Sequence, residues 1–470
     1  MTTLSKHWAR ATLNELIATD GLFADGDWVE SKDQDPQGAI RLLQLADIGE
    51  GAFLNKSNRF INEEKFVKLR CTELRANDVL IARMPDPLGR ACMMPELPQR
   101  CVTVVDVAVV RPGSLSVLPA WLMYVLNSPM VRQEIEVQSS GTTRRRISRG
   151  NLGNMELPIP PLAEQTRIAN KLDAVLARVD ACRDRLDRIP AILKRFRQSV
   201  LAAATSGKLT RDWREANFAE GSRLATYAEI SLADLLAEPT RNGRSVRDGD
   251  GTPVLRLTAL QGGDIDTTAS KAGEWTGINI DRFLIKAGDF LVARGNGSRE
   301  LVGRGGLVKG SPKDVAFPDT MIRVRVDKTL ILPRFLRLIW DTPAVRRQIE
   351  LTARTTAGIW KIAQPDLERL KLPVPPPAEQ AEIVRRVESL FAFADRLEAR
   401  YAIARAQVEK LTPATLAKAF RGELVLQDPS DEPADVLLER IRAKRGDTAA
   451  DNSKRGRKSP QARNHEKPPC

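Results

Sequence analysis

The 470-residue sequence contains a long internal duplication, which limits the folds that it can adopt. Residues 157–165 (LPIPPLAEQ) recur as residues 372–380 (LPVPPPAEQ), with seven of nine positions identical at a separation of 215 residues. The order continues upstream, where residues 76–83 (ANDVLIAR) match residues 287–294 (AGDFLVAR) at five of eight positions. Solenoid repeats are far shorter, about 20–50 residues. We therefore expect two whole domains, each with its own core.

Each copy ends in a long segment with the hydrophobic spacing of a coiled coil. Its apolar residues follow a 4-3-4-3 spacing, which is a 3.5-residue period. The seam residues are Ile168, Leu172, Val175, Val179 and Leu186 in the first segment and Ile383, Val387, Leu390, Leu397 and Val408 in the second. We expect the two segments to pack antiparallel and to hold the two variable domains at opposite ends. The alternative is that each segment packs against a different protein.

Local signals define where these helices begin and end. A pair of prolines precedes each one, at positions where a missing N–H costs nothing. Gly207 and Gly422 follow, and glycine readily adopts the left-handed conformation that ends a helix. Pro190 and Pro413 lie inside the two patterns, where they are expected to kink the helices or end them early.

The segments outside the helices predict mixed α/β domains, because short strand-like runs alternate with short helical runs. The strands are expected at 42–48, 78–83, 254–260 and 289–294, and helices at 121–126 and 335–340. The chain then divides into a first variable domain (1–156), a first helical region (157–210), a second variable domain (211–371), a second helical region (372–430) and a tail (431–470).

The tail carries much of the net charge of +13. From residue 440 onward there are ten Lys and Arg against three Asp and Glu, which contributes +7. The tail is poor in large apolar residues, so we expect residues 431–470 to be disordered. It could attract a polyanion by sequence-independent electrostatics or be a solvated segment without a specific role.

The rare residues argue against an enzyme. The chain has two histidines, one near each end, and five scattered cysteines without a C-x-x-C pair, so neither a catalytic residue nor a metal site is predicted. Phosphate-binding glycine motifs are missing as well. The sequence lacks a run of 18 apolar residues and a leader-like start, which argues against a membrane span and, with unpaired thiols, for a cytoplasmic location.

Arginine-rich turns are the remaining candidates for a functional site. Arginine can bind phosphate or guanine, and Asn can bind adenine. The candidates are Arg83, Arg90, Arg144, Arg145, Arg146 and Arg149 in the first domain and Arg294, Asn296, Ser298, Arg299, Arg304, Trp360 and Lys361 in the second. A single basic run is usually a solvated loop. Basic residues at matching places in both domains favour contact with DNA.

This layout strongly resembles the specificity (S) subunit of type I restriction–modification systems. The resemblance covers nearly the whole chain except the basic tail. It is carried by residues 161–165 (PLAEQ), 377–380 (PAEQ) and 196–201 (FRQSVL), and by the Gly-Asp pair at 288–289. The first copy departs from this pattern, because Asn77 replaces the glycine, so the turn there is expected to differ.

The resemblance implies two α/β (α+β) target recognition domains separated by two long helices that form an antiparallel coiled coil. Each domain would read one half of a bipartite target in double-stranded DNA, and the helices would fix the spacer. Two methyltransferase (M) subunits would dock on the chain and motor-nuclease (R) subunits would join them. AdoMet, ATP and magnesium would belong to these partners, and the chain itself would catalyse nothing. The alternatives are a coiled-coil scaffold that binds proteins without reading DNA, and a free-standing enzyme, which the missing motifs disfavour.

Overall fold

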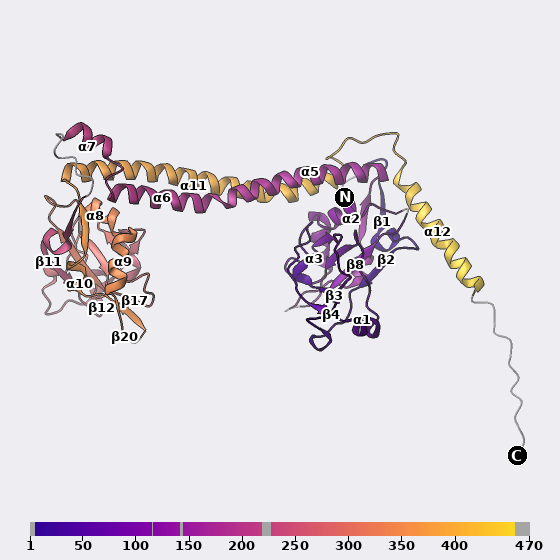
Figure 1. Cartoon of the computed structure of the whole chain (residues 1–470), viewed down its shortest axis with the longest axis horizontal. Helices are drawn as coiled ribbons and strands as arrows, with labels where there is room; N and C mark the ends of the chain where they lie inside the picture. Colours follow the sequence, from indigo (N-terminus) through magenta and orange to yellow (C-terminus); the bar gives the residue numbers. More distant parts are fainter. Residues whose placement is uncertain (1–4, 115, 142–143, 219–226, 357, 456–470) are drawn as a thin grey trace, which may run out of the picture. The chain divides into compact units, whose positions relative to one another are not determined.

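The chain forms two compact units, which we call unit 1 and unit 2. The computed structural model describes residues 5–114, 116–141, 144–218, 227–356 and 358–455 (Figure 1). Unit 1 draws on residues 1–186 and 404–470, and unit 2 on residues 187–403. Each unit has hydrophobic clusters of its own.

Unit 1 is built from small, mostly antiparallel sheets. One sheet has the strand order β2–β8–β5–β6, a second has the order β4–β3–β7, and β1 pairs with β9. The elements are β1 (Ala9–Thr12), η1 (Leu13–Leu16), β2 (Leu22–Asp25), η2 (Ser31–Asp33), β3 (Ile40–Leu43), η3 (Leu45–Asp47), β4 (Phe60–Ile61), α1 (Glu63–Leu69), β5 (Val79–Ala82), β6 (Ala91–Met93), β7 (Cys101–Thr103), β8 (Val107–Arg111), α2 (Pro119–Leu126), α3 (Pro129–Gln138), α4 (Arg149–Gly153), β9 (Glu156–Ile159), α5 (Leu162–Asp187) and α12 (Ala434–Arg455).

Unit 2 repeats this plan with additions. Its main sheet has the order β11–β19–β16–β18–β14–β13, β10 pairs with β22, β12 with β15, and β17–β21–β20 form a small sheet. The elements are α6 (Ile189–Thr205), α7 (Arg211–Asn217), β10 (Ala228–Ser231), η5 (Leu232–Leu235), β11 (Leu236–Asn242), β12 (Asp248–Leu255), η6 (Leu257–Ala259), β13 (Leu260–Gln261), β14 (Asp264–Ile265), β15 (Ser270–Gly273), η7 (Ile280–Arg282), β16 (Phe290–Ala293), β17 (Gly295–Asn296), β18 (Gly305–Leu307), β19 (Met321–Val326), α8 (Pro333–Trp340), α9 (Pro343–Thr352), β20 (Arg354–Thr356), β21 (Ile359–Lys361), α10 (Gln364–Glu368) and β22 (Lys371–Val374); α11 (Pro377–Ala419) is shared by the two units.

A helix packed on the central strands forms the core of each unit. In unit 1, α2 contacts β5 and β6, and its Trp121 is fully buried in the same cluster as Val79 and Ile81. In unit 2, α8 contacts β18, and Trp340 meets Phe290 with ring centroids 4.9 Å apart. These large apolar side chains supply the main favourable term for folding.

The Gly-Asp turn before the central strand has the same geometry in the two units. Gly288 has φ +91° and Asn77 has φ +70°, so the expected difference at Asn77 is wrong: asparagine also tolerates the left-handed region. The aspartate that follows is buried in both units. Asp78 accepts two hydrogen bonds from Arg111 (both 2.6 Å), and Asp289 accepts two from Arg325 (2.6 and 2.8 Å). The repeated aspartate of this turn therefore builds a structural ion pair in each unit.

The long helices pack antiparallel, as predicted. In unit 1, Ile168 and Leu172 near the start of α5 share a cluster with Leu416 near the end of α11. In unit 2, Val200 near the end of α6 shares a cluster with Ile383 near the start of α11. Ion pairs flank this packing in both units, for example between Arg183 Nε and Glu409 (3.4 Å) and between Arg197 and Glu398 (2.7 Å). All ten seam residues are buried or half-buried.

The prolines act differently in the two long segments. The first segment is interrupted, because α5 ends at Asp187 and α6 begins at Ile189 with Pro190 in its first turn. The second segment continues through Pro413 as one 43-residue helix. Gly207 and Gly422 follow the helix ends with φ of +75° and +76°, which is the left-handed conformation expected there.

The tail differs from the expectation of disorder from residue 431 onward. Residues 434–455 form α12, and Ala434, Leu437, Leu438 and Ile441 are buried in the main cluster of unit 1. These four positions follow the i, i+3, i+4, i+7 pattern of an amphipathic helix. The expectation failed because the charge of the whole tail concealed this short apolar pattern. Residues 456–470 lie outside the described residues.

Candidate nucleic-acid interface

Two candidate arginines of unit 1 are buried inside the protein. Arg83 is 4% exposed, pairs with Asp25 (2.6 Å) and donates to the carbonyl of Val105 (2.8 Å). Arg90 is 7% exposed and donates to the carbonyls of Ile48 (2.6 Å), Leu45 (2.7 Å) and Pro87 (2.9 Å). Burial lowers the pKa of both guanidinium groups. Both side chains hold loops of the protein together, and their burial argues against the predicted contact with DNA.

The other arginines of unit 1 lie in and after a short hairpin. Its two sides meet at an antiparallel bridge between Ser140 and Arg146, and residues 142–143 of the predicted basic run lie outside the described residues. Arg144 is exposed and makes no ion pair with another described residue. Arg145 is exposed and pairs with Glu136 (2.5 Å). The hairpin therefore presents at least one unengaged cation to solvent.

The remaining two arginines of unit 1 are tied to the protein more closely. Arg146 is half-buried, and its guanidinium lies 3.3 Å from Asp106. Arg149 is exposed, lies over the ring of Phe23 at 6.0 Å and donates to the carbonyl of Phe23 (3.1 Å). Each keeps N–H groups that could still donate to a phosphate.

In unit 2, six of the seven candidates gather around the β17–β21–β20 sheet. Asn296 pairs with Trp360 in the strand register, and Gly295 with Lys361. Arg299 is exposed and lies over the ring of Trp360 at 5.1 Å, with its N–H groups donating to the carbonyl of Glu350. Ser298 donates its backbone N–H to Asn296 Oδ1 (3.0 Å), and Arg294 directly precedes β17 and is half-buried. The sheet thus combines an aromatic ring, an amide and cations.

Arg304 lies apart from this sheet. It is exposed and lines a cavity of about 540 Å³ together with Glu300, Asp341, Arg346 and Glu350. Three carboxyl groups face two arginines in this cavity, so its charge does not favour a polyanion.

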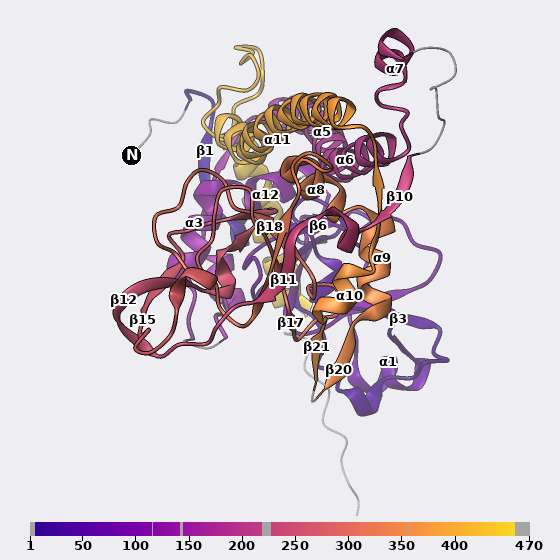
Figure 2. The ribbon, with the colours of Figure 1, turned by 90° about the vertical axis from the view of Figure 1, so that its left-hand side faces the viewer.

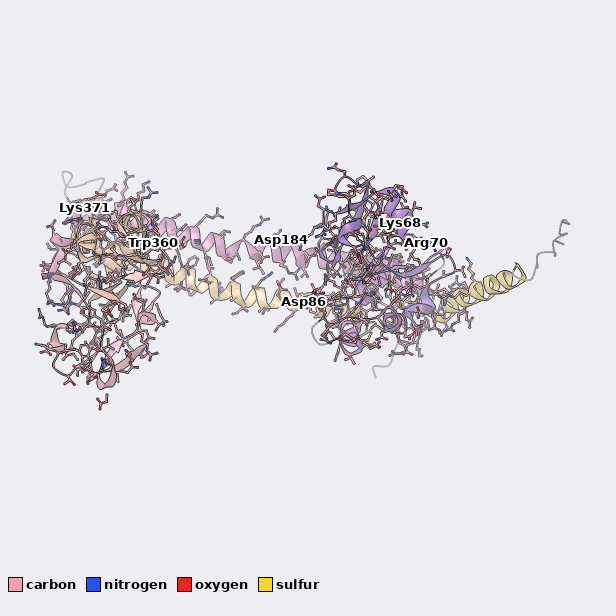
Figure 3. The ribbon with its side chains drawn as sticks, turned by 90° about the horizontal axis from the view of Figure 1, so that it is seen from below. Lys68, Arg70, Asp86, Asp184, Trp360 and Lys371 are labelled. Atoms are coloured by element: carbon pink, nitrogen blue, oxygen red, sulfur yellow. The ribbon has the colours of Figure 1, made fainter. Side chains whose placement is uncertain are left out.

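Both units present candidate residues at the end remote from the long helices. In unit 2, β20 and β21 lie at the end opposite α6 and α11, and two views at right angles agree on this (Figures 1 and 2). In unit 1, the same views place α1 at the end opposite α5. Figure 3 labels Trp360 on unit 2 and Lys68 and Arg70 on unit 1.

Lys68 and Arg70 are exposed candidates that the sequence reasoning missed. The signal was the basic second half of the α1 sequence, EEKFVKL, followed by Arg70 as its left-handed C-cap. A short helix between loops gave no repeat to draw attention to it.

Neither a membrane-spanning helix nor a metal-binding cluster of side chains occurs among the described residues. No helix among them is long and apolar enough to cross a bilayer. Across the same part of the chain, His, Cys, Asp and Glu form no group of three that could hold a metal ion.

Comparison with known proteins identifies the class. Residues 8–191 and 232–403 match the family model of the type I restriction modification DNA specificity domain. Since these matches cover most of the chain, it belongs to the family of type I restriction–modification DNA specificity subunits. Such subunits supply DNA recognition and are not themselves catalytic.

Individual relatives agree with this assignment. The chain is 37% identical over 361 residues to the type I restriction enzyme EcoKI specificity subunit of Escherichia coli (strain K12), covering 74% of this chain and 76% of the relative. It is 36% identical over 363 residues to the StySPI specificity subunit of Salmonella potsdam, again covering 74% and 76%.

Solved structures share the fold. One is a chain from a study of complex assembly and conformational transition of the type I R-M system, with a TM-score of 0.63 and 19% identity, covering 90% of this chain and 99% of that one. Another is the HsdS subunit from Thermoanaerobacter tengcongensis, with a TM-score of 0.58 and 17% identity, covering 90% and 98%.

Proposed function

We propose that the two units of this specificity subunit each read one half of a bipartite target in double-stranded DNA. The support is the duplication itself: two units with the same core and the same buried Asp–Arg pair carry different exposed side chains at the hairpin that precedes the last short helix. A shared scaffold with different surfaces suits two readers of different half-sites. The recognition domains would be residues 1–156 and 211–371, and residues 157–210 and 372–430 would fix the spacer.

The chain would work as part of a complex. Two methyltransferase subunits would dock on it, and motor-nuclease subunits would join them in the cytoplasm. AdoMet, ATP and magnesium would be bound by those partners. The recognition chain would contribute positioning: it would present the target adenine to a methyltransferase subunit, which would take the base out of the stack.

The DNA-contacting residues of unit 1 would include Arg144, Arg145, Arg146 and Arg149. Because binding to phosphates releases counterions, removing one arginine–phosphate interaction should reduce the slope of log affinity against log salt concentration by about 0.9. In unit 2, Asn296 and the Arg299–Trp360 pair would contact bases or the backbone, with Arg294, Ser298 and Lys361 beside them.

The test measures DNA binding of the complex with methyltransferase subunits over a range of salt concentrations. The target is first read from methylated adenines in the host genome. Replacing Arg144 and Arg145 together by Ala should weaken binding and flatten the salt dependence. Arg178→Ala, an exposed arginine on α5, serves as the matched control and should leave both unchanged. An unchanged slope for the hairpin variant would take these arginines out of the interface.

A domain exchange tests the two-reader proposal separately. Replacing residues 1–156 by the recognition domain of another family member should change one half of the methylated sequence and leave the other. A change in both halves would contradict modular reading. A complex that methylates without sequence preference would instead support the scaffold alternative.

A further inference from the structure

Each long helix begins with two polar side chains that are almost completely buried. Glu164 and Glu379 are 1% exposed, and Gln165 and Gln380 are 0% exposed. Buried polar groups persist in proteins when they are hydrogen-bonded, and leaving one unpaired costs free energy. The partners of these side chains therefore show what the Glu-Gln pair does.

The glutamine connects the long helix to the buried helix of the recognition domain, which is α2 in unit 1 and α8 in unit 2. In unit 1, Gln165 Oε1 accepts the backbone N–H of Leu118 (2.9 Å), and Nε2 donates to the carbonyl of Pro160 (3.0 Å). In unit 2, Gln380 Oε1 accepts the N–H of Leu332 (2.7 Å).

The side-chain amide N–H groups of Gln380 also have hydrogen-bond acceptors. Its Nε2 donates to the carbonyls of Leu330 and Pro375 (both 2.8 Å). Two of these bonds occur in both units: the glutamine accepts the N–H of the leucine before the buried helix and donates to the carbonyl of the proline five positions earlier. The bond to Leu330 is found in unit 2.

The residue that donates its N–H to the glutamine Oε1 is the N-cap of α2 in unit 1 and of α8 in unit 2. Leu118 caps α2 and Leu332 caps α8, and neither can cap the helix with its own side chain. A proline follows each of them, at N1. Because α2 and α8 are almost entirely buried in the recognition domain, a bond to their first residue fixes the domain, and not merely a loop.

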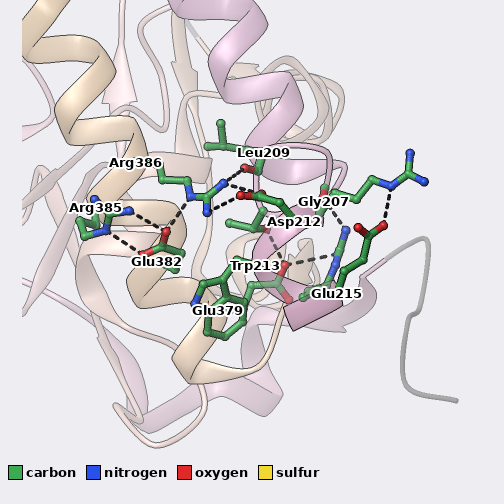
Figure 4. Close-up of polar contacts among 12 residues, drawn as sticks. Gly207, Leu209, Asp212, Trp213, Glu215, Glu379, Glu382, Arg385 and Arg386 are labelled. Carbon is green, nitrogen blue, oxygen red and sulfur yellow. Dashed lines mark hydrogen bonds and ion pairs between the residues drawn. The ribbon is translucent and has the colours of Figure 1, made fainter. Parts of the chain in front are cut away.

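The preceding glutamate secures the strand that enters each domain. Glu164 accepts the indole N–H of Trp8 (3.0 Å), just before β1. Glu379 accepts hydroxyl hydrogens from Tyr227, just before β10 (2.8 Å), and from Thr210 (2.6 Å). Figure 4 shows Glu379 beside the Glu382–Arg386–Asp212 ion pairs. The glutamate partners differ between the units, whereas the glutamine bonds to the helix cap and to the preceding proline occur in both.

We propose that Gln165 and Gln380 are positioning residues that fix the orientation of each recognition domain on its long helix, and thereby the length of spacer that the complex accepts. This rests on the proposed function. Apolar contacts such as those of Ile168 and Leu172 hold the domain on the helix, but hydrophobic packing is non-directional. Hydrogen bonds are directional, so the glutamine determines the angle at which the domain sits.

The geometry of DNA shows why this angle matters. One base pair more or less between the half-sites moves them by roughly 3.4 Å along the axis and rotates them by about 35°, since one turn takes about 10–10.5 base pairs. A domain held by packing and by two directional bonds resists such a shift. A domain held by packing alone can follow more of this shift and rotation, and so tolerates an altered spacer better.

The test uses the complex with methyltransferase subunits and three duplexes: the target found in the host genome, and versions with the spacer one base pair shorter and one longer. Gln165→Met and Gln380→Met keep the length of the side chain and its packing but remove the bonds. We expect the ratio of methylation rates, native over altered spacer, to fall at least tenfold. Gln407→Met, at an exposed glutamine on α11, is the matched control and should keep the wild-type ratio.

The outcomes separate positioning from simple stability. If a Met variant methylates all three duplexes more slowly by the same factor, with a lower unfolding temperature, the glutamine is only structural and the proposal is overturned. Gln165→Asn and Gln380→Asn, which stay polar but cannot span both partners, give a second test if the Met variants do not fold. If the wild-type complex itself shows no bipartite target, the proposed function fails, which is a different result from an unchanged ratio.

Discussion

Helix α12 makes a sharp prediction because the amino-acid composition of the tail argued against it. Leu438 is 3% exposed and lies in the main cluster of unit 1, so Leu438→Ala removes three buried carbons. At about 0.8 kcal/mol per methylene group, the lost transfer energy is roughly 2.4 kcal/mol, and the cavity left behind raises the total to about 3–4 kcal/mol. For a unit of this size each kcal/mol shifts the unfolding temperature by about 2–4 °C, so we expect a decrease of about 6–16 °C.

The matched control is Leu426→Ala. Leu426 is 92% exposed in the segment between α11 and α12, so its truncation should change the stability by less than about 0.5 kcal/mol. Thermal unfolding followed by Trp fluorescence gives the size of the effect, and amide hydrogen exchange gives its location. Protection should fall in β1 and η1, which contact α12, and persist in β16 and β19 of unit 2.

Two results would refute this reasoning. If Leu438→Ala and Leu426→Ala unfold at the same temperature, α12 does not support the core of unit 1. If protection falls equally in both units, the cores are not separate. A chain that lacks residues 446–470 keeps the four buried residues of α12 and should match the full chain, whereas one that lacks residues 434–470 should lose protection in β1.

Three further predictions concern buried groups and one turn. Asp289→Asn should lower the free energy of unfolding by about 1.5–3 kcal/mol, because Arg325 loses its charge-assisted bonds to Asp289 but keeps its ion pair with Glu238. Hydrogen exchange should place the loss in unit 2, and a loss below about 1 kcal/mol would contradict the prediction. Burial raises the pKa of Asp27 to about 6, so the folded state holds its proton more tightly and stability should fall as pH rises from about 4 to 6. Denaturation at both pH values should show that Asp27→Asn removes about 2 kcal/mol of this fall, and an identical pH dependence in the variant would disprove the assignment. Gly288→Ala should lower the free energy of unfolding by about 1–2 kcal/mol, because Gly288 has φ +91°. Gly288→Asn should lower it less, since Asn77 adopts the same turn in unit 1. Equal decreases in the unfolding temperature of the two variants would exclude backbone strain as the cause.

The long helices could be predicted because their signals are local and long. The apolar spacing runs over four heptads, Pro190 restricts the backbone at its own position, and the two terminal glycines readily adopt the left-handed conformation that ends a helix. Pro413 shows the limit of such signals: α11 continues through it. A long helix packed along its length can tolerate the loss of one hydrogen bond, so tertiary contact overrides a local rule.

The candidate site was less predictable because burial depends on residues far away in the sequence. Arg90 is enclosed by the carbonyls of Ile48 and Leu45, which are more than 40 positions distant. Nothing in the residues around Arg90 distinguishes it from the exposed Arg144. The charge of an arginine was visible in the sequence, but its availability to DNA was not.

Recurrence between the copies has a second consequence for the site. Residues that repeat between the copies maintain the fold that the two units have in common. Asp78 and Asp289 pair with equivalent strands, and Gln165 and Gln380 bind equivalent helix caps. Matching arginines in the two copies favoured DNA contact, yet Arg83 is part of the scaffold.

Reading two different half-sites requires side chains that differ at corresponding places. The hairpins supply such a place. Ile147 donates its N–H to the carbonyl of Arg83, and Ile362 donates its N–H to the carbonyl of Arg294, so the residues before each isoleucine correspond. Unit 1 carries three consecutive arginines there, whereas unit 2 carries Trp360 and a single lysine. Base contacts are therefore best sought where the copies disagree on an exposed surface, and scaffold contacts where they agree on a buried one.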